Sequence, residues 1–307
     1  MISGRILSTA SLFATAAAWG QLPPSVLQPG RPVAPLAPTA ETVAAPAAVP
    51  ASAKSNTLSP EEIAQGWRLL FDGQRLLGLR GVQQKDPLSA GWVIGPGELV
   101  LKEGKQLRTT GGDLITTDVF WDFDFRFEWK TTASADSGIR YLLLESGSQT
   151  PAGLEYQIID DVHNSISLKA GPLRRSGSLD NVIAVGNNAK LRVADPLNKV
   201  GDPWNEGRIV VQGNHVEHWM NGEKVLAFEL GPQLKRLAEA NKMKVFAFFG
   251  IKNRTRICIV DQGTEVAFRN LKIRPLLPQA TATPVPAKRN IPNPLLLPGK
   301  PAPATGQ

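Results

Sequence analysis

Residues 119–131, VFWDFDFRFEWKT, decide the fold class of this chain. Aromatic residues occupy every second position from Trp121 to Trp129, and charged residues occupy the positions between them. Because successive side chains of a β-strand point to opposite faces, this alternation predicts a long strand. One face of that strand is expected to be aromatic and buried, and the other to be charged.

Stretches that favour strands also fill most of the chain on either side of residues 119–131. Within residues 207–230, the dipeptides Gly213-Asn214 and Asn221-Gly222 favour the positive φ angles of two-residue hairpin turns. This segment is therefore expected to form three strands. Further strands are expected at residues 67–71, 91–95, 97–102, 113–118, 138–145, 154–160, 244–251, 255–261 and 264–274.

Only two helices are expected among these strands. Ser59 and Glu62 have the spacing of a capping box with Pro60 at the first helical position, which predicts a short helix that begins there. Residues 232–242, PQLKRLAEANK, predict the second helix. About a dozen strands without an alternation of strands and helices predict an all-β fold, an antiparallel two-sheet β-sandwich of the jelly-roll type.

The distribution of proline separates a folded domain from two tails. Nine of the 25 prolines lie in residues 21–60 and nine more in residues 275–307. The flanking segments are rich in Ala and Pro and poor in aromatic residues, so they cannot bury enough apolar surface to fold. We therefore expect disordered tails at residues 21–58 and 276–307 around one domain at residues 59–275.

The first 20 residues have the pattern of a secretory signal peptide. Arg5 precedes an apolar stretch of about 13–14 residues, and small residues precede Gln21, where cleavage is expected. A membrane anchor is the alternative, but the stretch is shorter than the ~18–20 residues that span a bilayer. The sequence thus predicts export to the periplasm or the extracellular space, with no membrane span in the mature chain.

The net charge of +7 does not indicate a nucleic-acid partner. Six of the 34 Lys and Arg residues and one of the 27 Asp and Glu residues lie outside residues 61–274, so the folded region has an excess of only +2. Its basic residues form no stripe with interleaved aromatic residues. The single cysteine, Cys258, lies in an apolar stretch and is expected to be a buried thiol.

Residues 154–161, LEYQIIDD, combine β-favouring apolar residues with three carboxylates and an amide. On a strand, Glu155 and Gln157 share one face at a spacing of about 6.5–7 Å. That spacing suits a polyhydroxylated ligand and equally suits a solvated face, so the residues alone leave both interpretations open. Arg140 lies in an apolar stretch, where its charge must be paired or line a cleft.

Several catalytic and metal-binding motifs are missing from the sequence: GxSxG, HExxH, a phosphate-binding glycine loop and a cysteine cluster. His215 and His218 are three residues apart on an expected strand, so they should face opposite ways rather than form a metal pair. His218 shares its face with Val216 and Met220, which fits a core histidine or a functional one. No cofactor is predicted, and a divalent cation is left open.

Six motifs occur in order along the folded region: GIRY at 138–141, GLEYQIIDD at 153–161, His163, GSL at 177–179, PWNEGRIVVQGNHVEHWMNGEKV at 203–225 and EVAFRNLKIRPL at 265–276. In this order they resemble the 3-keto-disaccharide hydrolase domain family. The resemblance covers residues 66–275. It implies a concanavalin-like jelly roll and a small carbohydrate as substrate or ligand.

The resemblance also implies an activity and a set of site residues. The substrate would be a sugar whose C3 hydroxyl has been oxidised to a ketone, which acidifies the proton on C2. A base would remove that proton while the glycosidic oxygen leaves, and water would then add back. Catalytic roles are expected for Glu155 or Asp160 as the base, with His218 as the alternative base. Substrate-binding roles are expected for Arg140, Gln157, Asp161, His163, Trp204, Asn205, Asn221, Arg269 and Asn270.

The sequence departs from the family pattern at three places. Asn164-Ser165 replaces Pro-Asp, Asp180-Asn181-Val182 replaces Tyr-Asp-Leu, and the late strand has Val260 and Gln262 where the family has glutamine and histidine. A domain that loses polar cleft residues can bind sugars without cleaving them. A non-catalytic carbohydrate-binding or cell-surface domain is therefore the alternative function.

Overall fold

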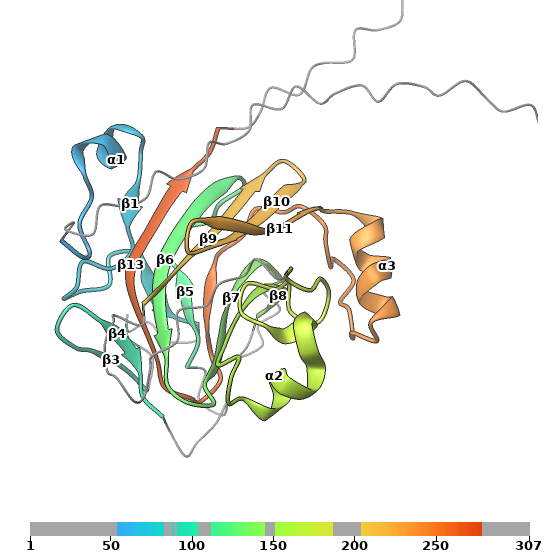
Figure 1. Ribbon diagram of the computed structural model, residues 1–307. Helices are drawn as coiled ribbons and strands as arrows, with labels where there is room; N and C mark the ends of the chain where they lie inside the picture. Colours follow the sequence, from blue (N-terminus) through green and yellow to red (C-terminus); the bar gives the residue numbers. More distant parts are fainter. Residues whose placement is uncertain are drawn as a thin grey trace, which may run out of the picture. The chain divides into compact units, whose positions relative to one another are not determined.

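The computed structural model describes residues 54–82, 88, 91–103, 112–144, 151–186 and 204–277. Within these residues the strands form two antiparallel sheets that pack face to face, as Figure 1 shows. The predicted two-sheet β-sandwich is thereby confirmed. The predicted signal peptide and nearly all of the two predicted tails lie outside the described residues, as do residues 83–87, 89–90, 104–111, 145–150 and 187–203.

The first sheet contains eight of the described strands, and β6 and β13 lie at its centre. Its order is β11 (Glu223–Glu229), β10 (His215–Met220), β9 (Asn205–Gln212), β6 (Phe123–Thr131), β13 (Val266–Pro275), β4 (Leu99–Leu101) and β3 (Trp92–Ile94), and β1 (Arg68–Leu69) also pairs with β13. The three strands expected within residues 207–230 are β9, β10 and β11, which pair in sequence as two hairpins.

The second sheet contains five of the described strands and carries the polar residues discussed below. Its order is β2 (Leu79–Gly81), β5 (Leu114–Thr116), β12 (Cys258–Asp261), β7 (Asp136–Leu144) and β8 (Ala152–Ile159). Strand β8 is therefore an edge strand, and it pairs only with β7 among these strands. The thiol of Cys258 is buried in this sheet, as predicted.

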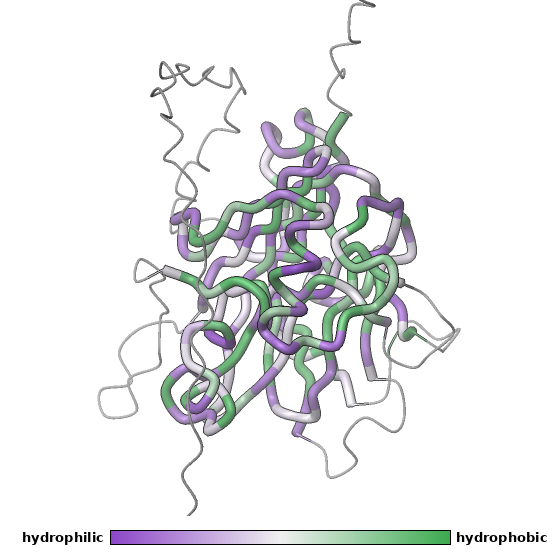
Figure 2. The backbone as a smooth tube through the Cα atoms, turned by 90° about the vertical axis from the view of Figure 1, so that its right-hand side faces the viewer, coloured by the Kyte–Doolittle hydropathy of each residue, from purple (hydrophilic) through white to green (hydrophobic). Residues whose placement is uncertain are grey.

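Aromatic rings from both sheets meet in the core. The side chains of Phe123, Phe125 and Phe127 on β6 are at most 2% exposed. Phe123 contacts Tyr141 of the second sheet edge to face at a centroid distance of 6.4 Å, and Phe127 contacts Tyr156 in the same way at 5.3 Å. Figure 2 shows how hydrophobic and hydrophilic residues alternate along the strands, which is the pattern from which the buried face was predicted.

The charged face of β6 is more buried than its composition suggests. Asp124 is fully buried, and Arg208 Nε on the neighbouring strand donates to its Oδ1 at 2.7 Å. Arg274 on the other neighbour also contacts Asp124, at 3.1 Å. Trp121 was expected on the buried face, but it precedes the strand and is 46% exposed. Strands on both sides of β6 thus supply the arginines that make the buried charge of Asp124 tolerable.

The two predicted helices are present. In α1 (Pro60–Ala64), the backbone N–H of Glu62 donates to Ser59 Oγ and the Glu62 carboxylate accepts from the Ser59 N–H, which confirms the capping box. The second is α3 (Pro232–Ala240). None of the described helices is long and apolar enough to cross a membrane.

A third helix and one missing strand were not foreseen. Helix α2 (Ser165–Ala170) is capped by Asn164, whose Oδ1 accepts from two backbone N–H groups, and the 3-10 helix η1 (Gly171–Arg174) follows it. The strand expected at residues 244–251 is wrong, because the chain makes turns there instead. The N–H of Phe249 donates to the carbonyl of Phe246, so the backbone folds back on itself.

Candidate active site

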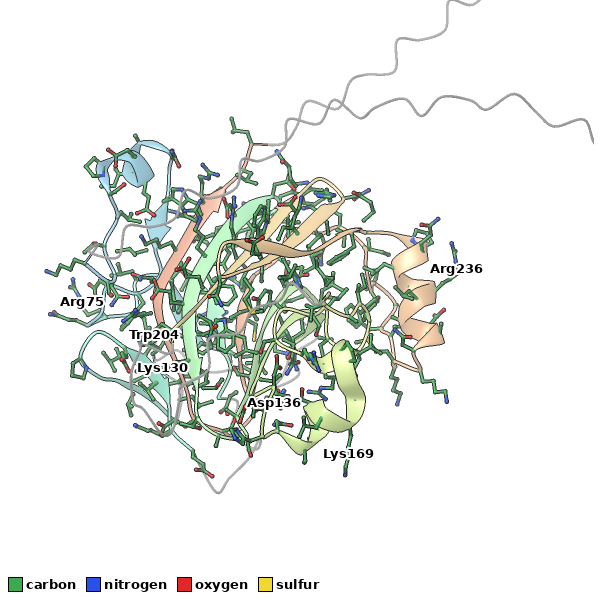
Figure 3. All side chains as sticks on the ribbon, viewed as in Figure 1. Arg75, Lys130, Asp136, Lys169, Trp204 and Arg236 are labelled. Carbon is green, nitrogen blue, oxygen red and sulfur yellow. The ribbon has the colours of Figure 1, made fainter. Side chains whose placement is uncertain are left out.

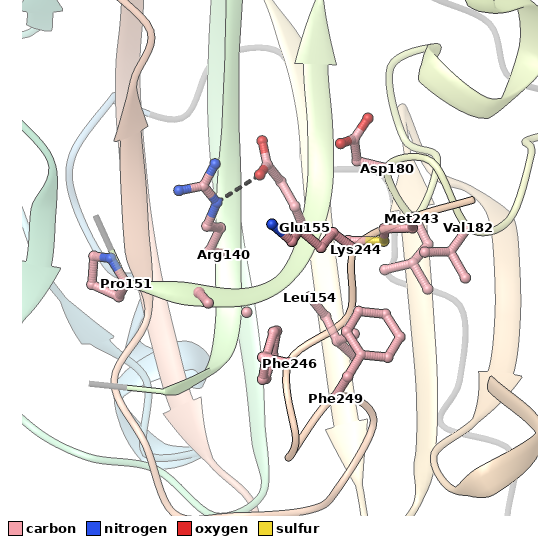
Figure 4. Close-up of a pocket in the computed structure, with 13 residues that line it drawn as sticks. Arg140, Pro151, Leu154, Glu155, Asp180, Val182, Met243, Lys244, Phe246 and Phe249 are labelled. Atoms are coloured by element: carbon pink, nitrogen blue, oxygen red, sulfur yellow. Dashed lines mark hydrogen bonds and ion pairs between the residues drawn. The ribbon is translucent and has the colours of Figure 1, made fainter. Parts of the chain in front are cut away.

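A pocket of about 310 Å³ lies at the β8 edge of the second sheet (Figure 4). Its walls come from Arg140 on β7, from residues 151–155 at the start of β8, from residues 179–182 after η1, and from residues 243–249 after α3. Arg140, Glu155, Asp180 and Lys244 are its charged residues, and the rest of its lining is apolar or glycine.

Arg140 and Glu155 face each other across β7 and β8. They are cross-strand partners, and the guanidinium Nε donates to the carboxylate Oε2 at 2.6 Å. Their neighbours Tyr141 and Leu154 point into the core, so this pair lies on the outer face of the sheet. Burial alone would lower the pKa of Arg140, but the Glu155 carboxylate raises it above its ordinary value.

A glycine gives the Glu155 side chain the room that it needs. Gly138 lies on β7 opposite Gln157, and a methyl group on Gly138 would lie 2.8 Å from Cγ of Glu155. The Glu155 side chain therefore lies over the bare backbone of Gly138. This close approach requires a glycine at residue 138, although the backbone there does not have a positive φ.

Asp180 places a second carboxylate in the pocket. Its backbone N–H donates to the carbonyl of Glu155 at 3.0 Å, and its Oδ2 accepts from Asn181 at 2.7 Å. Burial, together with the nearby charge of Glu155, raises the pKa of Asp180 to about 7 against the opposing effect of Arg174. A carboxyl group with such a pKa is suited to take up or release a proton near neutral pH.

A polar network continues from Asp180 away from the pocket. Arg174 Nε lies 3.3 Å from Oδ1 of Asp180, and another nitrogen of Arg174 donates to Asp136 at 3.2 Å. Asp136 also accepts from Nε2 of Gln157 at 2.7 Å. Gln157 is fully buried, and its Oε1 has no hydrogen-bond partner among the residues that the structure describes. Gln157 thus does not line the pocket, but it is linked to Asp180 through Asp136 and Arg174.

A protein-family model for the 3-keto-alpha-glucoside-1,2-lyase-like domain matches residues 66–274. The chain belongs to this family. A relative called 3-keto-disaccharide hydrolase, from Bacteroides thetaiotaomicron, is 31% identical over 252 residues, which cover 73% of this chain and 83% of the relative. A solved structure of a candidate glycosyl hydrolase from Parabacteroides distasonis is 27% identical, with a TM-score of 0.61, and the match covers 73% of this chain and all of that one.

The structure of this family member places Asp160 outside the pocket lining, at the turn that follows β8. Its carboxylate accepts from the backbone N–H groups of Ser134, Val162 and His163 at 2.8–3.2 Å and contacts the His163 ring at 2.9 Å. Burial favours the neutral form, but these hydrogen bonds lower the pKa of Asp160 overall. The carboxylate holds a turn together, so its geometry does not favour the expected role as the base.

Asp161 and His163 belong to the same turn and do not line the pocket. Asp161 accepts from the backbone N–H of Ser176 at 3.0 Å, and burial raises its pKa to about 6. The side chain of His163 is 55% exposed and contacts Asp160. Asp160 and Asp161, at the end of LEYQIIDD, therefore accept hydrogen bonds from backbone N–H groups of the segment that follows β8.

His218 lies in the core between the two sheets, as the core interpretation predicted. Its Nδ1 donates to the carbonyl of Gly177 at 2.9 Å, so its Nε2 accepts from the Tyr141 hydroxyl at 2.7 Å. Burial lowers the pKa of His218 to about 4. His215 points to the other face and contacts Glu229, so the two histidine side chains face opposite ways, as predicted. The complete burial of His218 does not favour the role of alternative base.

The remaining five predicted residues lie on strands of the first sheet or directly next to them, and they do not line the pocket. Trp204 is buried beneath the guanidinium of Arg269, 4.2 Å from its ring centre, and beneath Lys130 at 4.5 Å. Figure 3 shows Trp204 and Lys130 well separated from Asp136 of the second sheet. Arg269 and Asn270 both bind the Glu128 carboxylate, and Asn221 donates to Asn205 at the hairpin turn.

The sequence pattern thus found Arg140 and Glu155 but missed Asp180 and the residues of 243–249. Asp180 directly follows the GSL motif, and it could have been found as an acid in a position where the family has tyrosine. Within the described residues, no three His, Cys, Asp or Glu side chains are grouped so that they could hold a metal ion.

Proposed function

We propose that this domain hydrolyses 3-keto-glycosides by removing the proton next to the ketone and expelling the glycosidic oxygen. The observation that carries this proposal is the meeting of Glu155, Arg140 and Asp180 in one pocket. Family membership and the name of the Bacteroides relative support the substrate class.

The chemistry needs a base, an acid and a group that stabilises negative charge. The C2–H bond breaks, its electron pair forms the C1=C2 double bond, and the C1–O bond breaks as the glycosidic oxygen takes a proton. Water then adds across the double bond, with its oxygen on C1 and a proton on C2. One water is consumed in total, and the keto sugar and the free alcohol are the products.

The pocket residues fit these three roles. We assign the base to Glu155, which Arg140 holds in place, and the acid that protonates the leaving oxygen to Asp180. A pKa of about 7 lets Asp180 carry that proton at neutral pH. The Arg140 guanidinium would stabilise the negative charge that develops on the ketone oxygen. Gln157 would support this arrangement through Asp136 and Arg174.

The test is turnover of 3-keto-trehalose and of a 3-keto-glucoside by the full chain and by Glu155→Gln and Asp180→Asn. We expect each variant to lose at least about 100-fold in kcat while it keeps the wild-type circular dichroism spectrum. Glu229→Gln, on the exposed surface of the first sheet, is the matched control and should keep full activity. Saturable binding without turnover by the wild type would favour the carbohydrate-binding alternative, and neither binding nor turnover would overturn both functions.

We also infer that the protein acts outside the cytoplasm, because residues 1–20 have the pattern of a secretory signal peptide. The mature chain would then begin at Gln21. N-terminal sequencing of the protein from the periplasmic and culture fractions of the expressing cell tests this inference. A cell-associated chain that still begins at Met1 would contradict it.

A further inference from the structure

The pocket has a charged part and an apolar part. In Figure 4, the Glu155 carboxylate lies between the Arg140 guanidinium and Asp180, whereas Leu154, Phe246 and Phe249 lie together away from these charged groups. Nine of the 13 lining residues are apolar or glycine. We propose that the pocket selects keto-glycosides whose leaving group is apolar, such as a phenyl group, over disaccharides. This proposal rests on the proposed function.

The reaction fixes which end of the substrate meets which part of the pocket. The proton on C2 and the glycosidic oxygen must reach the two carboxylates, so the keto sugar lies in the charged part beside Glu155 and Asp180. The leaving group then extends past the glycosidic oxygen toward the apolar part. The leaving group would therefore contact the apolar side chains of Met243, Phe246 and Phe249, together with Leu179 and Val182.

The apolar part offers little to a second sugar. A sugar ring carries several hydroxyl groups, each of which loses a hydrogen bond to water when it is buried. The side chains of Met243, Phe246 and Phe249 cannot replace those bonds. An apolar ring has no such loss, and it removes the half-buried surfaces of Met243 and Phe246 from water.

The size of the pocket points the same way. A volume of about 310 Å³ is at the lower end of the range of ~300–1,000 Å³ that is typical of ligand pockets. A compact ligand, of one sugar ring and one flat ring, suits this volume. Met243 is unbranched and flexible, so it can adapt to rings of somewhat different shape.

The experiment compares kcat/KM for phenyl 3-keto-glucoside and 3-keto-trehalose in the full-length protein and in three variants. We expect the wild type to favour the phenyl substrate by about tenfold or more. Phe246→Ala should lower kcat/KM for the phenyl substrate by about tenfold, mainly through KM, and change that for the disaccharide by less than about threefold. Phe248→Ala is the matched control, because Phe248 lies in the same segment but is 55% exposed and does not line the pocket.

Met243→Gln keeps the shape of the side chain and adds an amide, so it tests the proposal without creating a cavity. It should shift the ratio of the two kcat/KM values toward the disaccharide. Turnover of 3-keto-trehalose that equals or exceeds that of the phenyl substrate, or that Phe246→Ala lowers to the same extent, would overturn the preference but leave the proposed function standing. Turnover of neither substrate would overturn the proposed function and, with it, the preference.

Discussion

The Nε atom of Arg140 lies 2.6 Å from Oε2 of Glu155, across the last two strands of the second sheet. The side chains are only 16% and 10% exposed, so each charge depends on the other to be tolerated there. The same ion pair is therefore expected to stabilise the pairing of β7 with β8 and to position two charged groups in the pocket.

Removing one member of this pair should cost more stability than removing both. We expect Glu155→Ala to lower the free energy of unfolding by about 3 kcal/mol, because the Arg140 charge is left buried and unpaired. The double variant with Arg140→Met should recover part of that loss. Urea denaturation of the two single variants and the double variant measures the coupling, and additive losses would mean that the pair does not stabilise the edge.

Gly138→Ala should damage activity more than folding. The added methyl group would push Cγ of Glu155, which lies 2.8 Å from the position of that group, away from its present place over the strand. We expect kcat to fall by about tenfold or more, with a stability loss of about 1–3 kcal/mol. Gly95→Ala is the control, because a methyl group at that turn would approach the nearest backbone atom only to 4.0 Å. An unchanged kcat in Gly138→Ala would mean that catalysis does not depend on the position of the Glu155 side chain.

The titration of Asp180 should be visible in the pH dependence of stability. Its pKa is raised from 3.8 to about 7 on folding, so the folded state binds the proton more tightly and the ionised form is disfavoured. The associated stability is present below pH 4 and is lost as the pH rises toward 7. Asp180→Asn should therefore gain stability relative to the wild type over this range, by up to about 4 kcal/mol.

Urea denaturation at pH 4, 5, 6 and 7 of the wild type and of Asp180→Asn measures this difference. Other groups with raised pKa values, such as Asp161 and Asp113, titrate in both proteins and cancel in the comparison. A difference in stability that stays constant from pH 4 to pH 7 would contradict the raised pKa of Asp180.

His218 should prove structural. Replacing it with leucine leaves the Tyr141 hydroxyl and the Gly177 carbonyl without their buried partner, which should cost about 2–4 kcal/mol. Adding Tyr141→Phe should cost less in this background than in the wild type, because the hydroxyl has already lost its partner. Activity measured well below the unfolding temperature should be retained within about threefold. A folded His218→Leu protein without activity would restore His218 as the base.

Several elements of the fold were predictable because short sequence patterns determine them. The alternation in residues 119–131 predicts β6, the Asn-Gly turn predicts one hairpin of the first sheet, and the capping box predicts α1. The pattern at 244–251 misled because apolar residues that wrap a pocket have the same composition as a buried strand. Helix α2 was missed because a helix of six residues has little periodicity of its own.

The sequence by itself determined that this chain is a two-sheet β-sandwich with Arg140 and Glu155 on a strand-favouring background, because side-chain alternation and turn chemistry are local properties of the chain. Only the tertiary structure decided which polar residues meet. It brings Asp180 to Glu155 through the pairing of β8 with the segment after η1, and it buries His218 between the sheets. It also places Arg269 on the other sheet, with its guanidinium over the ring of Trp204 next to β9. Such meetings depend on contacts between residues far apart in the chain, which no local pattern records.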